Sequence, residues 1–211
     1  MKIVQPGFAR RSTPKVKNGK VQRKNRWVQS PNYYLKNRKA ILIERRKPGR
    51  GYRHIVTRED IEKFIELIPN WAELSRGLNA IVLVPGSTPR YGYHVPGVLH
   101  ICAWEEDLWQ DWPRKFAQDN VSLLERLRVP TQELSDGQVR CFFSEENAKA
   151  FQLLDVFLHE LGHHRDRMTT KHGERTARGE EFAERFALEY EAMIFPRYVK
   201  VFRPRFARLP S

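Results

Sequence analysis

The segment that most constrains the fold is residues 159–163, which read His-Glu-Leu-Gly-His. Side chains four residues apart lie on the same side of an α-helix, so a helix here brings the imidazoles of His159 and His163 together. Two imidazoles at this spacing can bind one metal ion, and the pattern favours zinc. Glu160 follows the first histidine and can act as a general base at the open position of the metal. The segment therefore predicts a helix, two metal ligands and a catalytic carboxylate.

Two histidines leave a catalytic zinc site one protein ligand short, because such sites usually have three. A second helix is predicted over residues 179–194, and we expect it to pack across the first. One face of that helix carries two acids and two alanines: Glu180, Glu184, Ala183 and Ala187. The small alanines allow a close approach of the two helices, so that a carboxylate at Glu180 can reach the metal. Glu184 lies one turn later, where it can accept a hydrogen bond from a ligand imidazole.

Both helices carry a recognisable pattern. The stretches His159-Glu160-Leu161-Gly162-His163 and Glu180-Glu181-Phe182-Ala183 resemble the gluzincin pattern, in which an H-E-x-x-H helix is followed by an E-x-x-A helix. The second helix is also similar to the closing motif of the small ImmA/IrrE metallopeptidases, which have Asn or Asp where this chain has Glu184. The resemblance covers residues 144–195.

This resemblance implies a zinc-dependent metallopeptidase, a hydrolase that cleaves peptide bonds with a metal-activated water. The ligands that it implies for Zn2+ are His159, His163 and Glu180, and the general base that it implies is Glu160. The substrate would be a protein or peptide. Proteases of this kind commonly bind their substrate as an extra strand along a sheet edge, and Val98–Cys102 could form that edge or be an ordinary strand of the sheet.

Other side chains near the motif are weaker candidates. His172, Tyr190 and Tyr198 could each stabilise the oxyanion of the reaction, and the sequence does not choose among them. Tyr190 can equally be a core residue. His164 directly follows the motif and points about 100° away from the ligands, so we expect it at the surface or behind the ligands.

The charged residues are distributed unevenly along the chain. Residues 1–50 hold 16 of the 38 Lys and Arg residues but one of the 25 Asp and Glu residues, whereas the rest of the chain holds 22 basic and 24 acidic residues. We therefore expect a basic, extended arm over residues 1–39 and a single, nearly neutral domain over residues 40–211. The arm has few apolar side chains, so it cannot bury enough surface to fold on its own.

The basic arm suggests a second class of function. A run of lysines and arginines from Lys15 to Arg26 precedes Trp27, Tyr33 and Tyr34. Phosphate backbones attract such a run and aromatic rings stack on bases, so nucleic acid is a candidate partner. The alternative function is a nucleic-acid-associated regulatory protein that keeps a protease-like metal site. A third interpretation is a structural metalloprotein without turnover.

The pattern of apolar and turn residues predicts an α+β fold, with a small antiparallel sheet packed on a two-helix zinc-binding core. Apolar runs predict strands over three segments: 80–84, 91–95 and 98–103. We expect Ser144 to cap a long helix that ends near Met168, and the final helix to end before Pro196. Residues 104–128 should be helical in part, with an interruption at Pro113.

The remaining sequence features concern the cellular setting. The apolar runs are far too short to cross a bilayer, and no apolar stretch follows the first two residues as it would in a secretory leader. Cys102 and Cys141 make no disulfide framework, although a single bridge between them stays open. We therefore expect a cytoplasmic protein with no membrane span.

Overall fold

The computed structural model describes residues 16–17, 20–21, 40–87, 90–170 and 178–207. Contacts between residues divide the chain into two units, Met1–Asn32 and Tyr33–Ser211. In the first unit, β1 (Val16–Lys17) and β2 (Lys20–Val21) pair antiparallel. Most of the predicted arm over residues 1–39, including its aromatic residues, lies outside the described residues. The second unit contains the fold described below.

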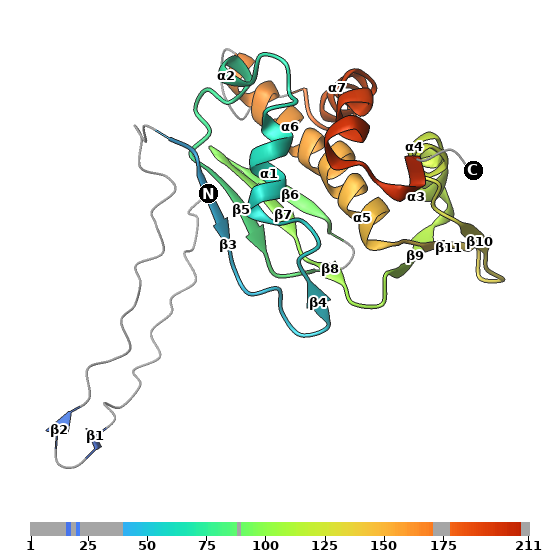
Figure 1. The fold of residues 1–211 in the computed structure, drawn as a ribbon, viewed down its shortest axis with the longest axis horizontal. Coiled ribbons are helices and arrows are strands. Elements are labelled where there is room, and N and C mark those ends of the chain that lie inside the picture. The colour runs from blue at the N-terminus through green and yellow to red at the C-terminus, as the bar shows by residue number, and fades with distance from the viewer. Residues whose placement is uncertain (1–15, 18–19, 22–39, 88–89, 171–177, 208–211) are drawn as a thin grey trace. The chain divides into compact units, whose positions relative to one another are not determined.

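The main sheet has four strands in the order β3-β5-β7-β6 (Figure 1). Their bounds are Leu42–Arg45 (β3), Ala80–Val84 (β5), Gly92–Val95 (β6) and Val98–Cys102 (β7). β3, β5 and β7 run parallel, and β6 runs antiparallel to β7. Between β3 and β5 the chain passes through helices α1 (Arg58–Ile65) and α2 (Trp71–Leu74), which supply the long connection that parallel neighbours require.

The α+β class is confirmed, but the prediction of an antiparallel main sheet is wrong. In this sheet the antiparallel pair is β6 with β7, the hairpin that the turn at Pro96-Gly97 predicts. Parallel pairing joins segments that are distant in the sequence, so local turn signals do not reveal it. The edge position considered for Val98–Cys102 is wrong as well, because this strand lies between β5 and β6. The edge is formed by Gly92–Val95.

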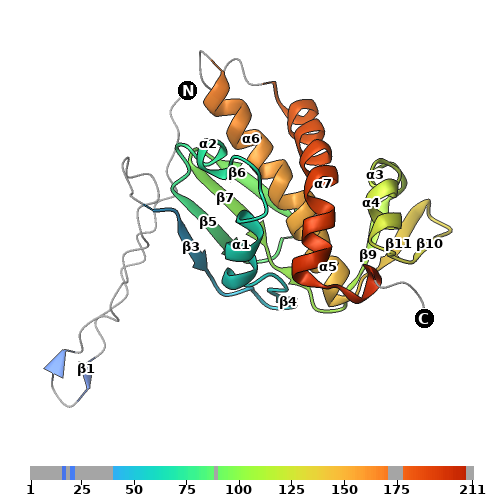
Figure 2. The same ribbon diagram turned by 45° about the horizontal axis from the view of Figure 1, so that its top comes forward.

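Helices cover one face of the main sheet (Figures 1 and 2). On that face, strand residues pack into one core with the helices: Ile81, Leu83, Leu99 and Ile101. Ala80 and Val82 alternate with them and belong to a separate cluster on the opposite face. The ring of Phe64 on α1 meets the ring of Phe157 edge to face at 5.3 Å between centroids, which ties α1 to the helix that leads into the metal motif.

Residues 159–163 lie in a continuous helical segment that begins at Ser144. The Ser144 side chain accepts a hydrogen bond from the backbone N–H of Asn147, and the Asn147 side chain reaches back to the Ser144 backbone. The segment comprises α5 (Glu145–Phe151), the π-helical η1 (Gln152–Phe157) and α6 (Leu158–Thr169). The predicted helix is thus confirmed. Its π-helical part is a feature that often accompanies functional sites, and here it immediately precedes the motif.

The second helix of the predicted pair, α7 (Glu180–Phe202), lies beside α6 (Figure 2). The two backbones come close together at Gly162. A Cβ atom on Gly162 would lie 2.9 Å from Cα and 3.1 Å from the carbonyl oxygen of Ala183. Glycine is therefore required at position 162, and Ala183 is fully buried. This contact confirms the predicted close approach of the two helices.

Helix α7 extends beyond the end that the sequence predicts. Pro196 lies inside the helix, where it removes a backbone hydrogen bond. Ile194 and Tyr198 flank it and are buried against the core, and Tyr198 also contacts the ring of Phe64. Tertiary packing therefore keeps the helix continuous through a residue that normally ends one.

Residues 104–128 contain more strand than predicted. Two strands come first, followed by two short helices: β8 (Trp104–Glu105), β9 (Trp109–Pro113), α3 (Arg114–Asp119) and α4 (Val121–Arg126). Pro113 precedes α3 and does not interrupt a helix, in keeping with the preference of proline for helix starts. β9 pairs with β11 (Gln138–Phe142), which pairs with β10 (Thr131–Glu133), in a three-stranded antiparallel sheet. β8 pairs with β4 (Tyr52–Arg53), and the short 3-10 helix η3 (Arg205–Ala207) follows α7.

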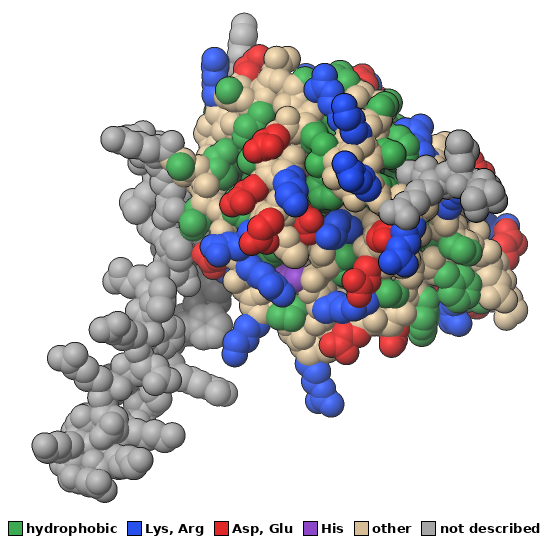
Figure 3. Space-filling view, in the orientation of Figure 1, with side chains coloured by type: hydrophobic (Ala, Val, Ile, Leu, Met, Phe, Trp, Pro, Cys, Tyr) green, Lys and Arg blue, Asp and Glu red, His purple; other side chains and the backbone are tan. Residues whose placement is uncertain are grey.

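The surface of the second unit mixes both signs of charge. Lysine and arginine side chains are interspersed with aspartate and glutamate on the face shown in Figure 3. Within the described ranges, no helix combines the length and apolar character that a membrane span needs. Cys102 and Cys141 are both buried free thiols, so the bridge between them is not formed.

We predict that Gly162→Ala destabilises the protein. Alanine would favour the helix by about 1 kcal/mol, but the clash with α7 should outweigh this gain and lower the free energy of unfolding by about 1–3 kcal/mol. Adding Ala183→Gly should not restore stability, because the closest contacts are with the backbone of α7. Urea denaturation of the metal-free proteins measures the effect. A Gly162→Ala variant as stable as the wild type would contradict this packing.

Candidate metal centre

The structure brings the three predicted ligands together at the start of α7. The Nε2 atoms of His159 and His163 are 3.1 Å apart. Oε2 of Glu180 lies 3.1 Å from Nε2 of His159 and 3.4 Å from Nε2 of His163. Among the described residues, this is the one group of three or more possible donors whose ligand atoms all lie within 4.8 Å of one another.

The spacing of these atoms fits a zinc ion. Atoms about 2.0–2.1 Å from one zinc ion at tetrahedral angles lie about 3.3 Å from each other, close to the three distances here. Burial, followed by the charge of His163, lowers the pKa of His159, with Glu180 opposing the shift. The lowered pKa favours the neutral imidazole, which is the form that binds metal. The donor set, two imidazoles and a carboxylate, is also one that catalytic zinc uses.

Glu160 is almost completely buried, with 6% of its surface exposed. Its Oε2 atom has no hydrogen-bond partner within the described part of the chain. Burial raises the pKa of Glu160 to about 8, and the charges of Glu180 and Asp155 add to the rise while Arg90 opposes it. A cation bound beside it would favour the ionised form. Burial of a carboxyl without a hydrogen-bond partner among the described residues costs free energy, and such groups are common at functional sites. Glu160 is therefore a candidate for the general base.

Gly92 on the edge strand makes room for this carboxyl. A Cβ atom on Gly92 would lie 2.6 Å from Cγ1 of Val156 and 3.0 Å from Oε1 of Glu160. A side chain at position 92 would therefore force the side chain of Val156, and with it that of Glu160, to shift. Gly92 was not predicted as a site residue, because the neighbouring sequence does not indicate that β6 packs against α6.

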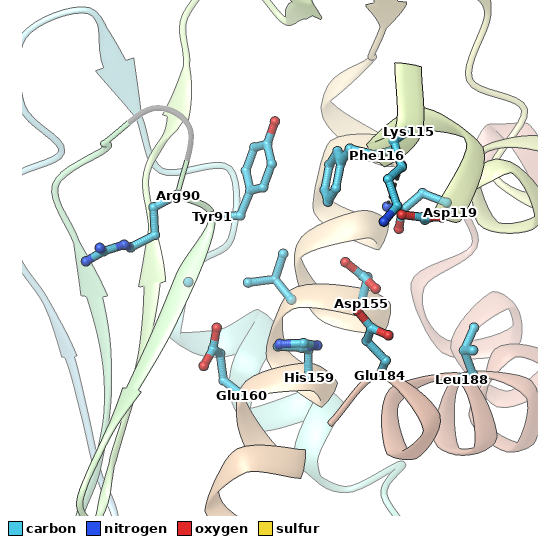
Figure 4. Close-up of a pocket in the computed structure, with 13 residues that line it drawn as sticks. Arg90, Tyr91, Lys115, Phe116, Asp119, Asp155, His159, Glu160, Glu184 and Leu188 are labelled. Atoms are coloured by element: carbon cyan, nitrogen blue, oxygen red, sulfur yellow. Dashed lines mark hydrogen bonds between the residues drawn. The ribbon is translucent and has the colours of Figure 1, made fainter. Parts of the chain in front are cut away.

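Two adjoining cavities flank the candidate centre and share Arg90, Gly92, His159 and Glu160 in their walls. The first, which we call the strand-side pocket, has a volume of about 760 Å³ and runs along the edge strand and Glu180. The second, the helix-side pocket, has a volume of about 640 Å³ and extends toward α3, as Figure 4 shows. The candidate centre thus lies in a cleft with room on both sides of it.

Asp166 is a second residue that the sequence analysis missed. It lies one turn after His163, and 1% of its surface is exposed. Its Oδ2 accepts a hydrogen bond from the backbone N–H of Gly179 at 3.0 Å, and its Oδ1 accepts one from Nε of Arg178 at 2.8 Å. Burial raises the pKa of Asp166, but these hydrogen bonds outweigh it and lower the pKa overall. Asp166 thereby fixes the start of α7, and with it Glu180, to the ligand helix.

His94 on the edge strand also faces the cleft. Burial lowers its pKa to about 3, with further lowering by His164 and His163, so the ring is neutral. Its Nε2 atom is buried and has no hydrogen-bond partner among the described residues. His94 lines the strand-side pocket and can offer a hydrogen bond to a bound molecule.

The weaker candidates have other positions. No hydrogen bond joins Glu184 to the imidazole of His159 or His163 in the described contacts, although its charge opposes the lowering of the pKa of His159 and raises the pKa of Asp155. The surface position considered for His164 is wrong, because its fully buried ring donates from Nε2 to the carbonyl of Arg76 at 2.9 Å. Tyr190 stacks on Phe186 at 4.3 Å between ring centroids, as a core residue does.

Two further predictions concern Tyr198 and residues outside the described ranges. Tyr198 is buried in the core against α1, which leaves it without access to substrate. His172 lies outside the described residues, as do most of the lysines and arginines of the basic run. The nucleic-acid partner therefore stays a prediction.

No protein-family model matches this chain, and neither curated proteins nor solved structures give a match. The resemblance to gluzincins therefore rests on the sequence motifs at residues 159–163 and 180–183 alone.

We predict that Asp166→Asn weakens zinc binding by about 10-fold, as loss of a partner that orients a ligand typically does. The substitution keeps the size of the side chain but removes the charge that holds Arg178. Competition with a chromogenic zinc chelator measures the affinity. Asp136→Asn, in an exposed turn, is the matched control and should bind zinc as the wild type does. Equal affinities in both variants would show that Asp166 does not position Glu180.

Proposed function

We propose that the protein is a zinc-dependent metallopeptidase in which His159, His163 and Glu180 hold the metal and Glu160 is the general base. The observation that carries this proposal is the convergence of the three donor atoms within 4.8 Å, in a cleft that a buried and unpartnered carboxyl also lines. Zinc at these donors would supply a Lewis acid that activates water and polarises a carbonyl group.

The proposed role of Glu160 follows from its surroundings. Its carboxylate is shielded from bulk water, so its basicity is high, as the raised pKa reflects. It can accept a proton from water and pass that proton to the leaving amine. Gly92 keeps the space around Oε1 open for this exchange.

The edge strand supports a peptide as the substrate. β6 is the last strand of the main sheet among the described residues, and all four of its residues line the strand-side pocket with the proposed metal ligands: Gly92, Tyr93, His94 and Val95. An extended peptide can add to such an edge through backbone hydrogen bonds. Its scissile carbonyl would then pass between His159 and Glu160, whose side chains border both pockets.

The open surroundings of the centre favour catalysis over a purely structural metal. Structural zinc sites are usually closed by four protein ligands, whereas catalytic sites keep one position open. Here three donors converge, and the side chain of Glu180 is 74% exposed. The adjoining pockets leave space for water and substrate at the remaining position.

Removal of the third ligand is expected to abolish stable zinc binding. Glu180→Gln loses the anionic donor, so dialysed protein should contain much less than one zinc ion per chain by elemental analysis. The matched control is Glu181→Gln, which changes the neighbouring exposed carboxylate and should keep one-to-one zinc. Full zinc content in Glu180→Gln would remove Glu180 from the ligand set.

Glu160→Gln should separate metal binding from catalysis. The variant should bind zinc as tightly as the wild type, because Glu160 is not a ligand, but cleave peptides at least about 100-fold more slowly. Mass spectrometry of a digested proteome, incubated with each zinc-loaded protein, identifies cleaved peptides and their rates. Undiminished cleavage by Glu160→Gln would reject Glu160 as the base. Absence of cleavage by the wild type across the whole proteome would contradict the proposed function.

A further inference from the structure

Three acidic side chains line the helix-side pocket besides the proposed base Glu160, and the proposed chemistry does not itself require them. The three are Asp119, Asp155 and Glu184. Glu160 is more than nine-tenths buried and its Oε2 has no hydrogen-bond partner among the described residues, so this polar atom of the pocket wall is free to interact with a bound group.

Asp155 and Glu184 carry charge that their neighbours do not neutralise. Their carboxylates lie close together beside His159 in Figure 4, one from η1 and the other from α7. Neither carboxylate makes a hydrogen bond or ion pair with the described residues. Burial raises the pKa of Asp155 to about 7, and the charges of Glu184 and Glu191 add to the rise. A positive group between the two carboxylates would relieve this repulsion.

The basic residues of the pocket leave this pair unneutralised. Arg90 points away from the pocket in Figure 4, and its guanidinium lies over the ring of Tyr93 at 5.5 Å. Lys115 is exposed on α3, one turn before Asp119, and no ion pair among the described residues joins it to Asp155 or Glu184. The interior of the pocket is therefore acidic.

The expected cation is an organic group on an apolar stem. Within the described residues, the one group of three or more converging donor atoms is that of His159, His163 and Glu180, so Asp155 and Glu184 are not part of a three-donor metal site. Apolar side chains complete the walls of the pocket: Tyr91, Phe116, Val156 and Leu188. Lysine and arginine side chains combine a charged end with an aliphatic stem that suits such walls.

We propose that the helix-side pocket binds a lysine or arginine side chain of the substrate, next to the cleaved bond, with Asp155 and Glu184 as the specificity-determining residues. This inference rests on the proposed function, because it takes the metal centre as the position of the cleaved bond. A guanidinium or ammonium group would lie between the two carboxylates, and its stem would lie along Phe116 and Val156. The substrate class is then peptides with a basic residue at the cleavage site.

Amino acid hydroxamates test this pocket without requiring turnover, because the hydroxamate binds the zinc ion and the side chain samples the pocket. Nα-acetyl-arginine hydroxamate and Nα-acetyl-norleucine hydroxamate differ in the charged end of the side chain. Calorimetry on zinc-loaded protein at pH 8 should give at least about 10-fold tighter binding of the arginine compound, a factor that corresponds to about 1.4 kcal/mol. Norleucine hydroxamate with a free amino group distinguishes a substrate N-terminus as the source of the cation.

The double variant Asp155→Asn/Glu184→Gln should lose the preference for arginine while it binds the norleucine compound as the wild type does. Both substitutions keep the side-chain shape and remove a repulsion, so thermal stability should not fall. Glu181→Gln/Glu189→Gln removes two charges from the exposed side of α7 and should keep the preference.

Equal binding of the two acetylated compounds, or an unchanged preference in the double variant, would overturn the pocket assignment and leave the proposed function standing. Tighter binding of norleucine hydroxamate with a free amino group than of either acetylated compound would assign the pocket to a substrate N-terminus and overturn a side-chain role. If no hydroxamate binds the zinc-loaded protein, the proposed metal centre itself fails, and the pocket assignment fails with it.

Discussion

The candidate site depends on the contact between the backbones of α6 and α7. Gly162 and Ala183 allow the two helices to approach until a single added Cβ atom would lie 2.9 Å from the neighbouring backbone. At that separation the first residue of α7, Glu180, reaches the imidazoles of the preceding helix. A wider spacing would leave the same residue types on the same helices without a common point for their donor atoms.

Some polar groups that are expensive to bury line the cleft beside the candidate site. Glu160 and His94 each have a buried side-chain atom without a partner in the described residues. The charges of Glu184 and Glu191 raise the pKa of Asp155. The sheet, the aromatic core and the hydrogen bonds of Asp166 stabilise the surroundings in which these groups persist. Buried polar atoms without partners beside a cleft are typical of a functional site.

Local patterns predicted the parts of the molecule that local physics determines. The spacing of His159 and His163, the cap at Ser144 and the turn before Val98 each depend on residues a few positions apart, and the structure has the helix and the hairpin that they indicate. The contact of Glu180 with the histidines joins two helices, but the E-x-x-A pattern that predicts it lies within one turn of the second helix.

Features that arise from long-range packing were not predictable. The parallel order of the main sheet, the edge position of β6 and the room that Gly92 leaves for Glu160 all depend on contacts between distant segments. The helix also continues through Pro196 because of tertiary packing, since burial of Ile194 and Tyr198 overrides the tendency of proline to end a helix. Asp166 and Asp155 are ordinary helix residues in the sequence, and they acquire roles only through what α7 brings next to them.

The central claim is that the two helices together form a zinc site, and the most direct measurement is anomalous diffraction at the zinc edge from crystals of the zinc-loaded protein. The account predicts one strong anomalous peak in contact with Nε2 of His159, Nε2 of His163 and the carboxylate of Glu180. A zinc-loaded crystal with no peak at these atoms, or with zinc held by two histidines and no contact to Glu180, would contradict it.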